Sequence, residues 1–351
     1  MKLMTSLGWL HRWLGFALCF TILSISLSGV LLVFKKEYLW LSMPDARQEL
    51  ELSLPDIAQT IETITAQYDE NEIALIQTHS EDLALYKVYS GESDRAWYNQ
   101  QGEQIDQWQN NGRLEDWLLD LHHRFLLGND IGLNIAGFSG LFLVLVALLG
   151  FITWWPRRRT LKLGVIPKQI KKGTLRVSHG NLGAINFLAI LLIAISGIIL
   201  TYPNESRDWL LTPFLEDEDY LLSEGPRDTL IGKEHISWQR VLERALAQYP
   251  GASVRWVTPE SFFSAYRVVG LQQTDGWNFS GKTVIYVDVL EGYMDVNIDA
   301  IKRPKIERLY DFLYPLHTAK LGLWYRLLLC LAGLALFFST LFGMIAFIKN
   351  K

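Results

Sequence analysis

The stretch His11-Arg12-Trp13-Leu14-Gly15 is followed, after twelve residues, by Ser28-Gly29. The same pattern returns in the second half of the chain, where His179-Gly180-Asn181-Leu182-Gly183 is followed at the same spacing by Ser196-Gly197. Both copies run along long apolar segments. A fixed spacing between similar segments is the signature of internal duplication, so we expect two related halves.

A second pair of similar segments supports the same division. Gly140–Gly150 recurs as Gly333–Gly343, with His122 upstream of the first copy and His317 upstream of the second. Each half is therefore predicted to contain a helix, a soluble insert and a second helix. Each of the four predicted helices has a histidine at or before its N-terminal end.

The composition indicates a membrane protein with substantial water-exposed parts rather than a soluble globule, because half of the residues are apolar, thirteen are Trp and a fifth are charged. A helix needs roughly 20 apolar residues to cross about 30 Å of hydrocarbon. Four segments are long enough: Leu14–Phe34, Ile131–Trp155, Leu182–Tyr202 and Leu323–Ile348. The first has no small-residue cleavage site, so we expect a retained anchor rather than a signal peptide.

The loop between the second and third spans is strongly basic. It has no Asp or Glu between Pro156 and Ser178. Its basic residues are Arg157, Arg158, Arg159, Lys162, Lys168, Lys171, Lys172 and Arg176. Lys and Arg collect in loops that stay in the cytoplasm, so we expect this loop and both termini there and the two inserts on the opposite side of the membrane.

The predicted fold class is membrane α-helical: a four-helix transmembrane bundle from an internal duplication, with two small α+β inserts. The pattern of each insert predicts a helix packed on a small antiparallel sheet. The expected boundaries are 1–36 for the first transmembrane helix, 37–128 for the first insert, 129–156 for the second helix, 157–178 for the basic loop, 179–203 for the third helix, 204–316 for the second insert and 317–351 for the fourth helix.

Other reactive side chains predict no separate site. Cys19 and Cys330 fall inside predicted spans, which excludes a disulfide framework in the inserts, and such thiols usually serve packing. His79 and His235 lie in the inserts without partner ligands, so we expect them to be solvated surface residues.

The topology sorts the four helix-end histidines into two pairs. His11 and His179 precede spans that begin in the cytoplasm, whereas His122 and His317 precede spans that begin outside. Two histidines at one depth on different helices can ligate a planar metal cofactor from both sides. Haem iron is the candidate, because neutral imidazole nitrogens fill its axial positions while the flat apolar macrocycle fits between helices.

Glycines near these histidines have two readings. Gly15 and Gly183 follow His11 and His179 by four residues, on the same helix face, where they would make room for a porphyrin. The alternative is a bundle packed through small residues, with close helix contacts at Gly29, Gly137, Gly140, Gly197 and Gly333. Zinc is a poorer candidate, since two histidines without a Cys or carboxylate make a poor tetrahedral site, and non-haem iron lacks its carboxylate ligand.

Four arginines stand within a turn or two of the histidines. They are Arg12, Arg124, Arg176 and Arg326. Cations at these positions could bind haem propionates. Each is also explained as an anchor to lipid headgroups.

The chain resembles the PepSY-associated transmembrane helix (PepSY-TM) family, whose members include bacterial inner-membrane ferric-siderophore reductases. The resemblance covers nearly the full length and rests on Leu10–Gly15, Leu121–Arg124 continuing to Gly128, Trp154–Arg158 and Pro315–Thr318. It implies four spans, periplasmic PepSY domains and b-type haems, with electrons passing outward to siderophore-bound iron.

Two details of the histidine motifs differ from the common family form. The third helix reads Val177-Ser178-His179-Gly180 where Leu-His-Arg is common, which keeps the histidine but not its basic neighbour. His122 is followed at once by His123, and only His122 has the family's six-residue spacing to Gly128. His122 is therefore the expected ligand and His123 its rival. A break near Gly128-Asn129-Asp130 is expected to fold His122 back toward the membrane.

The resulting hypothesis is a haem-dependent oxidoreductase with two haem b groups in a bacterial inner membrane. It would take electrons from quinol or a separate reductase and pass them to a periplasmic ferric siderophore, in contact with membrane lipids and with no nucleic acid. The alternative is a non-enzymatic regulatory membrane protein, whose PepSY domains bind a periplasmic protease or transporter. Transport of an iron complex is a third possibility, disfavoured because the spans lack charged residues.

Overall fold

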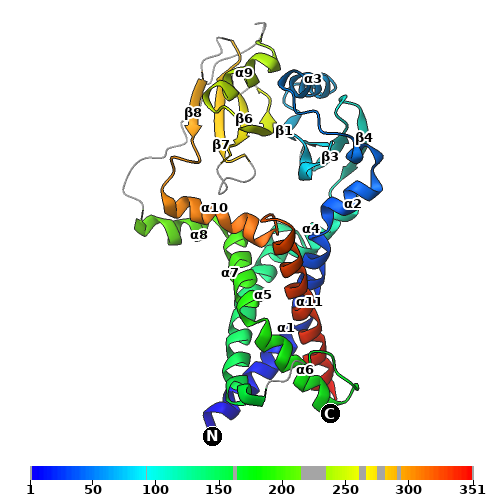
Figure 1. Ribbon diagram of the computed structural model, residues 1–351, viewed down its shortest axis with the longest axis vertical. Coiled ribbons are helices and arrows are strands. Elements are labelled where there is room, and N and C mark those ends of the chain that lie inside the picture. The colour runs from blue at the N-terminus through cyan, green and yellow to red at the C-terminus, as the bar shows by residue number, and fades with distance from the viewer. Residues whose placement is uncertain are drawn as a thin grey trace. The chain divides into compact units, whose positions relative to one another are not determined.

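The computed structural model describes residues 2–91, 93–160, 164–214, 235–260, 266–274, 281–290 and 294–349. The chain forms two compact units, one helical and one built on a sheet (Figure 1). The helical unit contains residues 1–35, 114–210 and 313–351, and the sheet unit contains residues 36–113 and 211–312. Lys162 of the basic loop lies outside the described residues.

The helical unit contains the apolar segments that the sequence predicts to cross a membrane. Its helices are α1 (Lys2–Leu32), α4 (Leu114–Arg124), α5 (Gly128–Trp154), α6 (Lys172–Ile185), α7 (Phe187–Thr201), α8 (Pro203–Leu211) and α11 (Leu323–Ile348), and α10 (Lys305–His317) ends in it. Leu3–Val33, Gly128–Arg159 and Leu323–Ile348 are each long and apolar enough to span a bilayer. The bent pair α6 and α7 makes a fourth span if it is counted as one.

The predicted third span is not one continuous helix. Its described residues form α6 and α7, which meet at Asn186 with a bend of 66°. The side-chain amide of Asn186 donates to the carbonyl oxygen of Ala332 on α11 at 2.7 Å. Asn side chains compete with the regular helical hydrogen bonds, which accounts for a break at the one amide in this apolar run. α7 alone is about 22 Å long, shorter than the hydrocarbon layer.

The histidines also lie differently relative to the helix ends than expected. α1 begins at Lys2, so His11 lies inside the helix rather than at its start. The break after α4 includes Phe125 and Leu126, which have φ values of 51° and 62°, and Gly128, which has a φ of 77°, so it lies near Gly128 as expected. As a result α5 begins at Gly128, six residues after His122, just as α11 begins six residues after His317.

The sheet unit combines both inserts. Its helices are α2 (Lys35–Ser42), α3 (Leu54–Thr65) and α9 (Trp238–Gln248), and its strands are β1 (Ile73–Gln77), β2 (Tyr86–Ser90), β3 (Asp94–Tyr98), β4 (Gln104–Gln109), β5 (Ser253–Thr258), β6 (Tyr266–Gln272), β7 (Thr283–Asp288) and β8 (Met294–Ile298). Short 3-10 turns of this unit lie at Pro44–Arg47, Ser80–Asp82 and Thr212–Phe214, and a further one, Trp155–Thr160, follows α5 in the helical unit. The strands form one antiparallel sheet in the order β4-β3-β2-β1-β5-β6-β7-β8 (Figure 1).

The two inserts are joined through β1 and β5, whereas the sequence predicted two separate small domains. Ile76 pairs with Val257 and Gln77 with Trp256. The hydroxyl of Thr78 adds a bond to the carbonyl oxygen of Val254, at 2.6 Å. An unpaired edge strand leaves backbone donors and acceptors open, so the pairing satisfies one edge from each insert.

The larger hydrophobic core of the sheet unit draws on both inserts, while a second, smaller cluster in the first insert includes Leu39, Trp97 and Trp108. To the larger core α3 contributes Ile57, Ile61 and Ile64, whose spacing puts them on one helix face. α9 contributes Trp238, Val241, Leu242 and Ala245, and the strands contribute residues from both inserts, including Ile76 and Val257. The core therefore crosses the junction between the inserts, and neither insert encloses it alone.

His79 and His235 are not the solvated surface residues that the sequence predicts. His79 lies next to the β1–β5 junction and is only 5 % exposed, with its ring 5.2 Å from that of Tyr86. His235 is half-buried and bonds through Nδ1 to Oε1 of Glu260 at 2.7 Å. His79 thus packs against Tyr86, and His235 takes part in an ionic network with Glu260.

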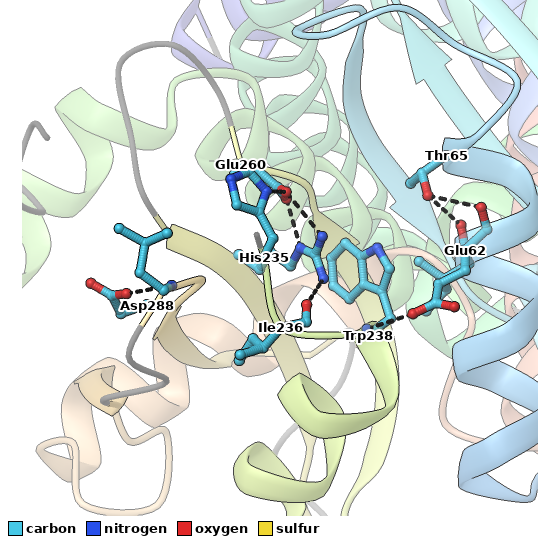
Figure 2. A network of polar contacts seen from close by, with 10 residues as sticks. Glu62, Thr65, His235, Ile236, Trp238, Glu260 and Asp288 are labelled. Atoms are coloured by element: carbon cyan, nitrogen blue, oxygen red, sulfur yellow. Dashed lines mark hydrogen bonds and ion pairs between the residues drawn. The ribbon is translucent and has the colours of Figure 1, made fainter. Parts of the chain in front are cut away.

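That network anchors the N-terminal end of α9 (Figure 2). Arg267 on β6 donates to both carboxylate oxygens of Glu260, at 2.6 and 2.9 Å, and to the carbonyl oxygen of Ile236 at 2.7 Å. Its guanidinium also lies 4.5 Å from the ring centre of Trp238. The backbone nitrogen of Trp238 donates to Oε1 of Glu62 on α3, at 2.8 Å, so a carboxylate of the first insert caps a helix of the second.

The Glu260 carboxylate predicts a pH dependence of stability. Burial alone would raise its pKa, but the hydrogen bonds and charge of Arg267, with the bond from His235, outweigh burial and leave the pKa below its usual value. A depressed folded pKa contributes stability above the unfolded pKa, near 4.3, which is lost as the pH falls through the folded value. Glu260→Gln should therefore cost about 1.5–3 kcal/mol at pH 7 and reduce the loss of stability on acidification.

Thermal unfolding of the detergent-solubilised protein at several pH values between 7 and 4, followed by tryptophan fluorescence, measures this effect. Glu70→Gln, at an exposed carboxylate, is the matched control and should follow the wild-type pH dependence. If the unfolding temperature of Glu260→Gln falls with pH as steeply as that of the wild type, the Glu260 carboxylate is not the source of the pH dependence.

Candidate functional site

The helical unit brings the four histidines together in two pairs. The rings of His11 on α1 and His179 on α6 have centroids 5.8 Å apart, with planes inclined by 47°. The rings of His122 on α4 and His317 on α10 have centroids 6.2 Å apart, with planes inclined by 50°. α6 lies near both chain termini, whereas α4 lies at the other end of the helical unit (Figure 1).

The rings of His11 and His179 are held through the same nitrogen. Nδ1 of His11 is 3.0 Å from the carbonyl oxygen of Val146 on α5. Nδ1 of His179 is 2.8 Å from the carbonyl oxygen of Ser339 on α11. The two acceptors lie at matched places, because each stands four residues before a glycine of the repeated segments, Gly150 or Gly343.

His122 and His317 repeat this arrangement at the other end of the unit. Nδ1 of His122 is 3.0 Å from the carbonyl oxygen of Ile25 on α1. His317 is bonded to the backbone of Ile193 on α7. These acceptors also stand four residues before a glycine, at Gly29 and Gly197.

Each histidine packs directly on the glycine that follows its acceptor. A Cβ built there would lie 2.8 to 3.0 Å from an atom of the imidazole: Gly150 meets His11, Gly343 meets His179, Gly29 meets His122 and Gly197 meets His317. Real Cβ atoms do not approach so closely, so any larger residue would displace the ring. The glycines thereby fix the position and orientation of all four imidazole rings.

The hydrogen bonds determine which ring nitrogen is available. A carbonyl oxygen can only accept, so Nδ1 carries the proton and Nε2 keeps its lone pair in the neutral imidazole. Burial, followed by the charge of the facing His317, lowers the pKa of His122 to about 3. Burial, followed by His123, lowers the pKa of His317 to about 4. Both rings are therefore neutral at physiological pH, the state in which imidazole binds a metal.

The distances between rings fit one metal ion held between two imidazoles. A metal–nitrogen bond of roughly 2.0–2.1 Å plus an imidazole radius of roughly 1.1 Å on each side places the centroids of coaxial rings on the order of 6.3 Å apart. The observed separations are 5.8 and 6.2 Å. Within the described part of the chain no group of three or more His, Cys, Asp or Glu side chains could hold a metal, so a metal bound at either pair would have two histidine ligands.

The remaining predicted site residues lie around these pairs. His123 is exposed, with its ring 5.7 Å from that of His122, and it does not occupy the position over Gly29. Arg124 pairs with Asp120 at 2.9 Å, and its Nε is buried without a hydrogen-bond partner. Arg326 donates to the carbonyl oxygen of Val33 at 2.8 Å, while Arg12 and Arg176 are exposed.

A sequence model of the PepSY-associated TM region matches residues 8–350, from α1 to the end of α11. The chain belongs to the PepSY-associated TM region family. No curated protein matches the sequence. Family membership covers both histidine pairs, both inserts and the basic loop, which agrees with a multi-pass membrane protein.

In this member of the PepSY-associated TM region family, sequence reasoning missed how the histidines are held. Gly15 and Gly183 were expected to clear space for a porphyrin. A Cβ at either position would lie 3.8 Å from the side chain of Val146 or Ser339, an ordinary van der Waals distance, so this role stays a prediction. The glycines that do meet the rings are Gly150 and Gly343, whose recurrence in the repeat was a signal, although nothing in it showed which side chain they face.

Proposed function

We propose that this protein is a di-haem b-type electron-transfer protein that reduces a ferric siderophore on the periplasmic side of a bacterial inner membrane. The observation that carries the proposal is the twofold occurrence of one arrangement: two imidazoles, each hydrogen-bonded to a backbone carbonyl, with ring centroids 5.8 or 6.2 Å apart. Metal-ligating histidines almost always donate their other ring N–H to a carbonyl or carboxylate, as these do.

Haem b would supply a reversible one-electron change at its iron. Nε2 of His11 and of His179 would hold the haem iron in one site, and Nε2 of His122 and of His317 would hold it in the other. The glycines on which the rings pack and the carbonyl oxygens that accept from Nδ1–H would hold these nitrogens in place, and the apolar helices would exclude water. The unpartnered Nε of Arg124, two residues from His122, is suited to bind an anionic group such as a propionate.

The helix contacts support the proposed origin of the bundle by duplication. Ile198 of α7 packs against Gly140 on α5, and Val30 of α1 packs against Gly333 on α11. A Cβ built on Gly140 or Gly333 would lie 2.9 or 2.6 Å from the respective side chain. Gly140 and Gly333 are matched positions of the second repeated segment. Ile198 and Val30 each directly follow, by one residue, the glycine of a Ser-Gly motif. Equivalent residues thus make equivalent contacts in both halves.

The joined sheet supports four spans. β1 and β5 can pair only if both inserts lie on the same side of the membrane, and α5 carries the chain across once between them. The bent pair α6 and α7 must then carry it back, so we infer that this pair is a broken span rather than a re-entrant loop. The basic loop between α5 and α6 favours the cytoplasm for that end of the unit and the periplasm for the sheet unit.

The direction of electron flow follows from this topology. Quinol or a separate reductase would deliver electrons, which would leave from the His122–His317 centre toward the periplasm. Each electron would convert one siderophore-bound Fe(III) to Fe(II). The softer, less charged ion is held less tightly by hard oxygen ligands, so reduction releases it.

The first experiment is the reduced-minus-oxidised visible spectrum of the purified protein, with haem quantified as its pyridine haemochrome. We expect low-spin b-type bands and about two haems per chain. Stopped-flow mixing of the reduced protein with a ferric siderophore should reoxidise the haem. A protein that stays colourless after expression with added haem would overturn the proposal and direct attention to periplasmic binding partners of the sheet unit.

A further inference from the structure

Among the described residues, a serine hydroxyl lies beside Nδ1 of three of the four histidines, and this contact distinguishes them from the fourth. Oγ of Ser28 is 3.1 Å from Nδ1 of His122, and Oγ of Ser196 is 3.0 Å from Nδ1 of His317. Oγ of Ser339 is 3.1 Å from Nδ1 of His179. The position that matches Ser339 in the first half is Val146, so His11 has the carbonyl acceptor but no hydroxyl.

The surrounding bonds show that these hydroxyls accept from the histidines. The hydroxyl of Ser28 donates to the carbonyl oxygen of Ser24 at 2.7 Å, and that of Ser196 donates to Leu192 at the same distance. A hydroxyl has one hydrogen, so the oxygen presents a lone pair to Nδ1–H. Ser339 likewise donates to the carbonyl oxygen of His179, at 3.2 Å. Each of the three Nδ1–H groups is therefore shared between a carbonyl and a hydroxyl.

Val146 takes the same place beside His11 that Ser339 takes beside His179, but it has no hydroxyl that could accept a hydrogen bond. A Cβ on Gly15 would lie 3.8 Å from Cγ1 of Val146, and a Cβ on Gly183 would lie 3.8 Å from Oγ of Ser339. The methyl group and the hydroxyl thus fill the same space against matched glycines. The difference between the two positions is one of hydrogen bonding and not of packing.

We propose that Ser28, Ser196 and Ser339 are positioning residues that lower the reduction potentials of the bound haem irons, and that Val146 leaves the two centres tuned unequally. This inference rests on the proposed function. Acceptors on Nδ1–H increase electron donation from the imidazole to the metal, which stabilises the ferric form before it takes up its electron. The His122–His317 centre has two hydroxyl acceptors and the His11–His179 centre has one.

The consequence for the proposed reaction concerns the driving force. Added electron donation from Ser28 and Ser196 makes the His122–His317 centre a stronger reductant, and this is the centre from which the electron would leave for the siderophore. The number of serine hydroxyls that accept a hydrogen bond from a histidine therefore rises along the proposed electron path. The centre with two such hydroxyls is the one from which the electron would leave for the siderophore.

Spectroelectrochemical titration of the haem-loaded full chain tests this inference. Ser28→Ala and Ser196→Ala should each raise the midpoint potential of one redox wave, and Ser339→Ala should raise that of the other. Val146→Thr adds a hydroxyl with the shape of valine and should lower the potential of the wave that Ser339→Ala raises. We expect the ratio of reduced to oxidised haem at a fixed potential to change about three- to tenfold, a tenfold change being 59 mV for one electron.

Ser26→Ala is the matched control, because Ser26 is a buried serine on the same helix as Ser28 whose hydroxyl donates to the carbonyl oxygen of Ile22 at 2.7 Å. It should move neither wave, and Ser28→Thr, which keeps a hydroxyl, should restore the wild-type potential. Haem bound normally with unmoved waves in the serine and Val146 variants would overturn this inference and leave the proposed function intact. Absence of haem from the wild-type protein would overturn both.

Discussion

The His122→Ala protein is expected to contain about one haem per chain instead of about two, with the remaining haem still low-spin. His122 and His317 face each other across 6.2 Å, and the ring of His122 is held by Ile25 and by Gly29. Removing it would leave a haem at this pair with His317 alone, whereas His11 and His179 are untouched at the other end of the unit. Pyridine haemochrome quantification and the spectrum of the retained haem measure the outcome.

His123→Ala is the control for this experiment. His123 is adjacent in sequence and its ring is 5.7 Å from that of His122. However, it is His122 that packs on Gly29 and bonds to the carbonyl oxygen of Ile25. The variant should keep both haems. Loss of one haem from His123→Ala, with retention of both in His122→Ala, would show that the rival histidine is the ligand.

Gly132→Ala is expected to cause the largest loss of stability in the helical unit. A Cβ at Gly132 on α5 would lie 1.9 Å from the carbonyl oxygen of Arg124, the last residue of α4. The atom in the way belongs to the backbone, so no side-chain rotation can relieve the contact. The next residues, Phe125 and Leu126, already have positive φ, so the segment between α4 and α5 has little freedom to adjust. We expect a cost of about 3 kcal/mol or more, which corresponds to a fall in Tm of roughly 6–12 °C.

The same substitution should also disturb one histidine pair selectively. His122 lies two residues before Arg124, so displacing the end of α4 moves its ring away from Gly29, and the haem of this pair should be lost while the other is kept. Gly173→Ala on α6 is the matched control, because a Cβ there meets nothing within 4 Å; it should leave Tm unchanged or slightly raised. A Gly132→Ala protein that unfolds at the wild-type temperature would show that α4 does not rest on α5 as described.

Much of the architecture could be predicted from the sequence because its signals are periodic or repeated. Long apolar runs identified the membrane-spanning helices, and the match of the family over residues 8–350 confirms the resemblance. The repeat and the charge of the loops sorted the histidines into the same two pairs that the structure brings together. That the pairs bind haem remains a prediction.

Other features could not be predicted, for identifiable physical reasons. The acceptors of the histidines are backbone carbonyls at Ile25 and Val146, and a carbonyl carries no side-chain signal. Asn186 interrupts an apolar run, but a single amide does not reveal whether a helix bends or the side chain simply finds a partner. The pairing of β1 with β5 depends on residues 176 positions apart, such as Thr78 and Val254, and strand patterns are local.

The pairing of β1 with β5 also has a consequence for biosynthesis. Thr78 leaves the ribosome 176 residues before Val254, which at 5–20 residues per second corresponds to roughly 9–35 seconds. During this delay the intervening helices must be inserted, while the nascent first half holds strand β1 with an open edge. Exposed edges of this kind invite pairing with other chains. A chaperone that shields this strand would therefore raise the share of newly made protein that escapes aggregation, and slower translation would lower it.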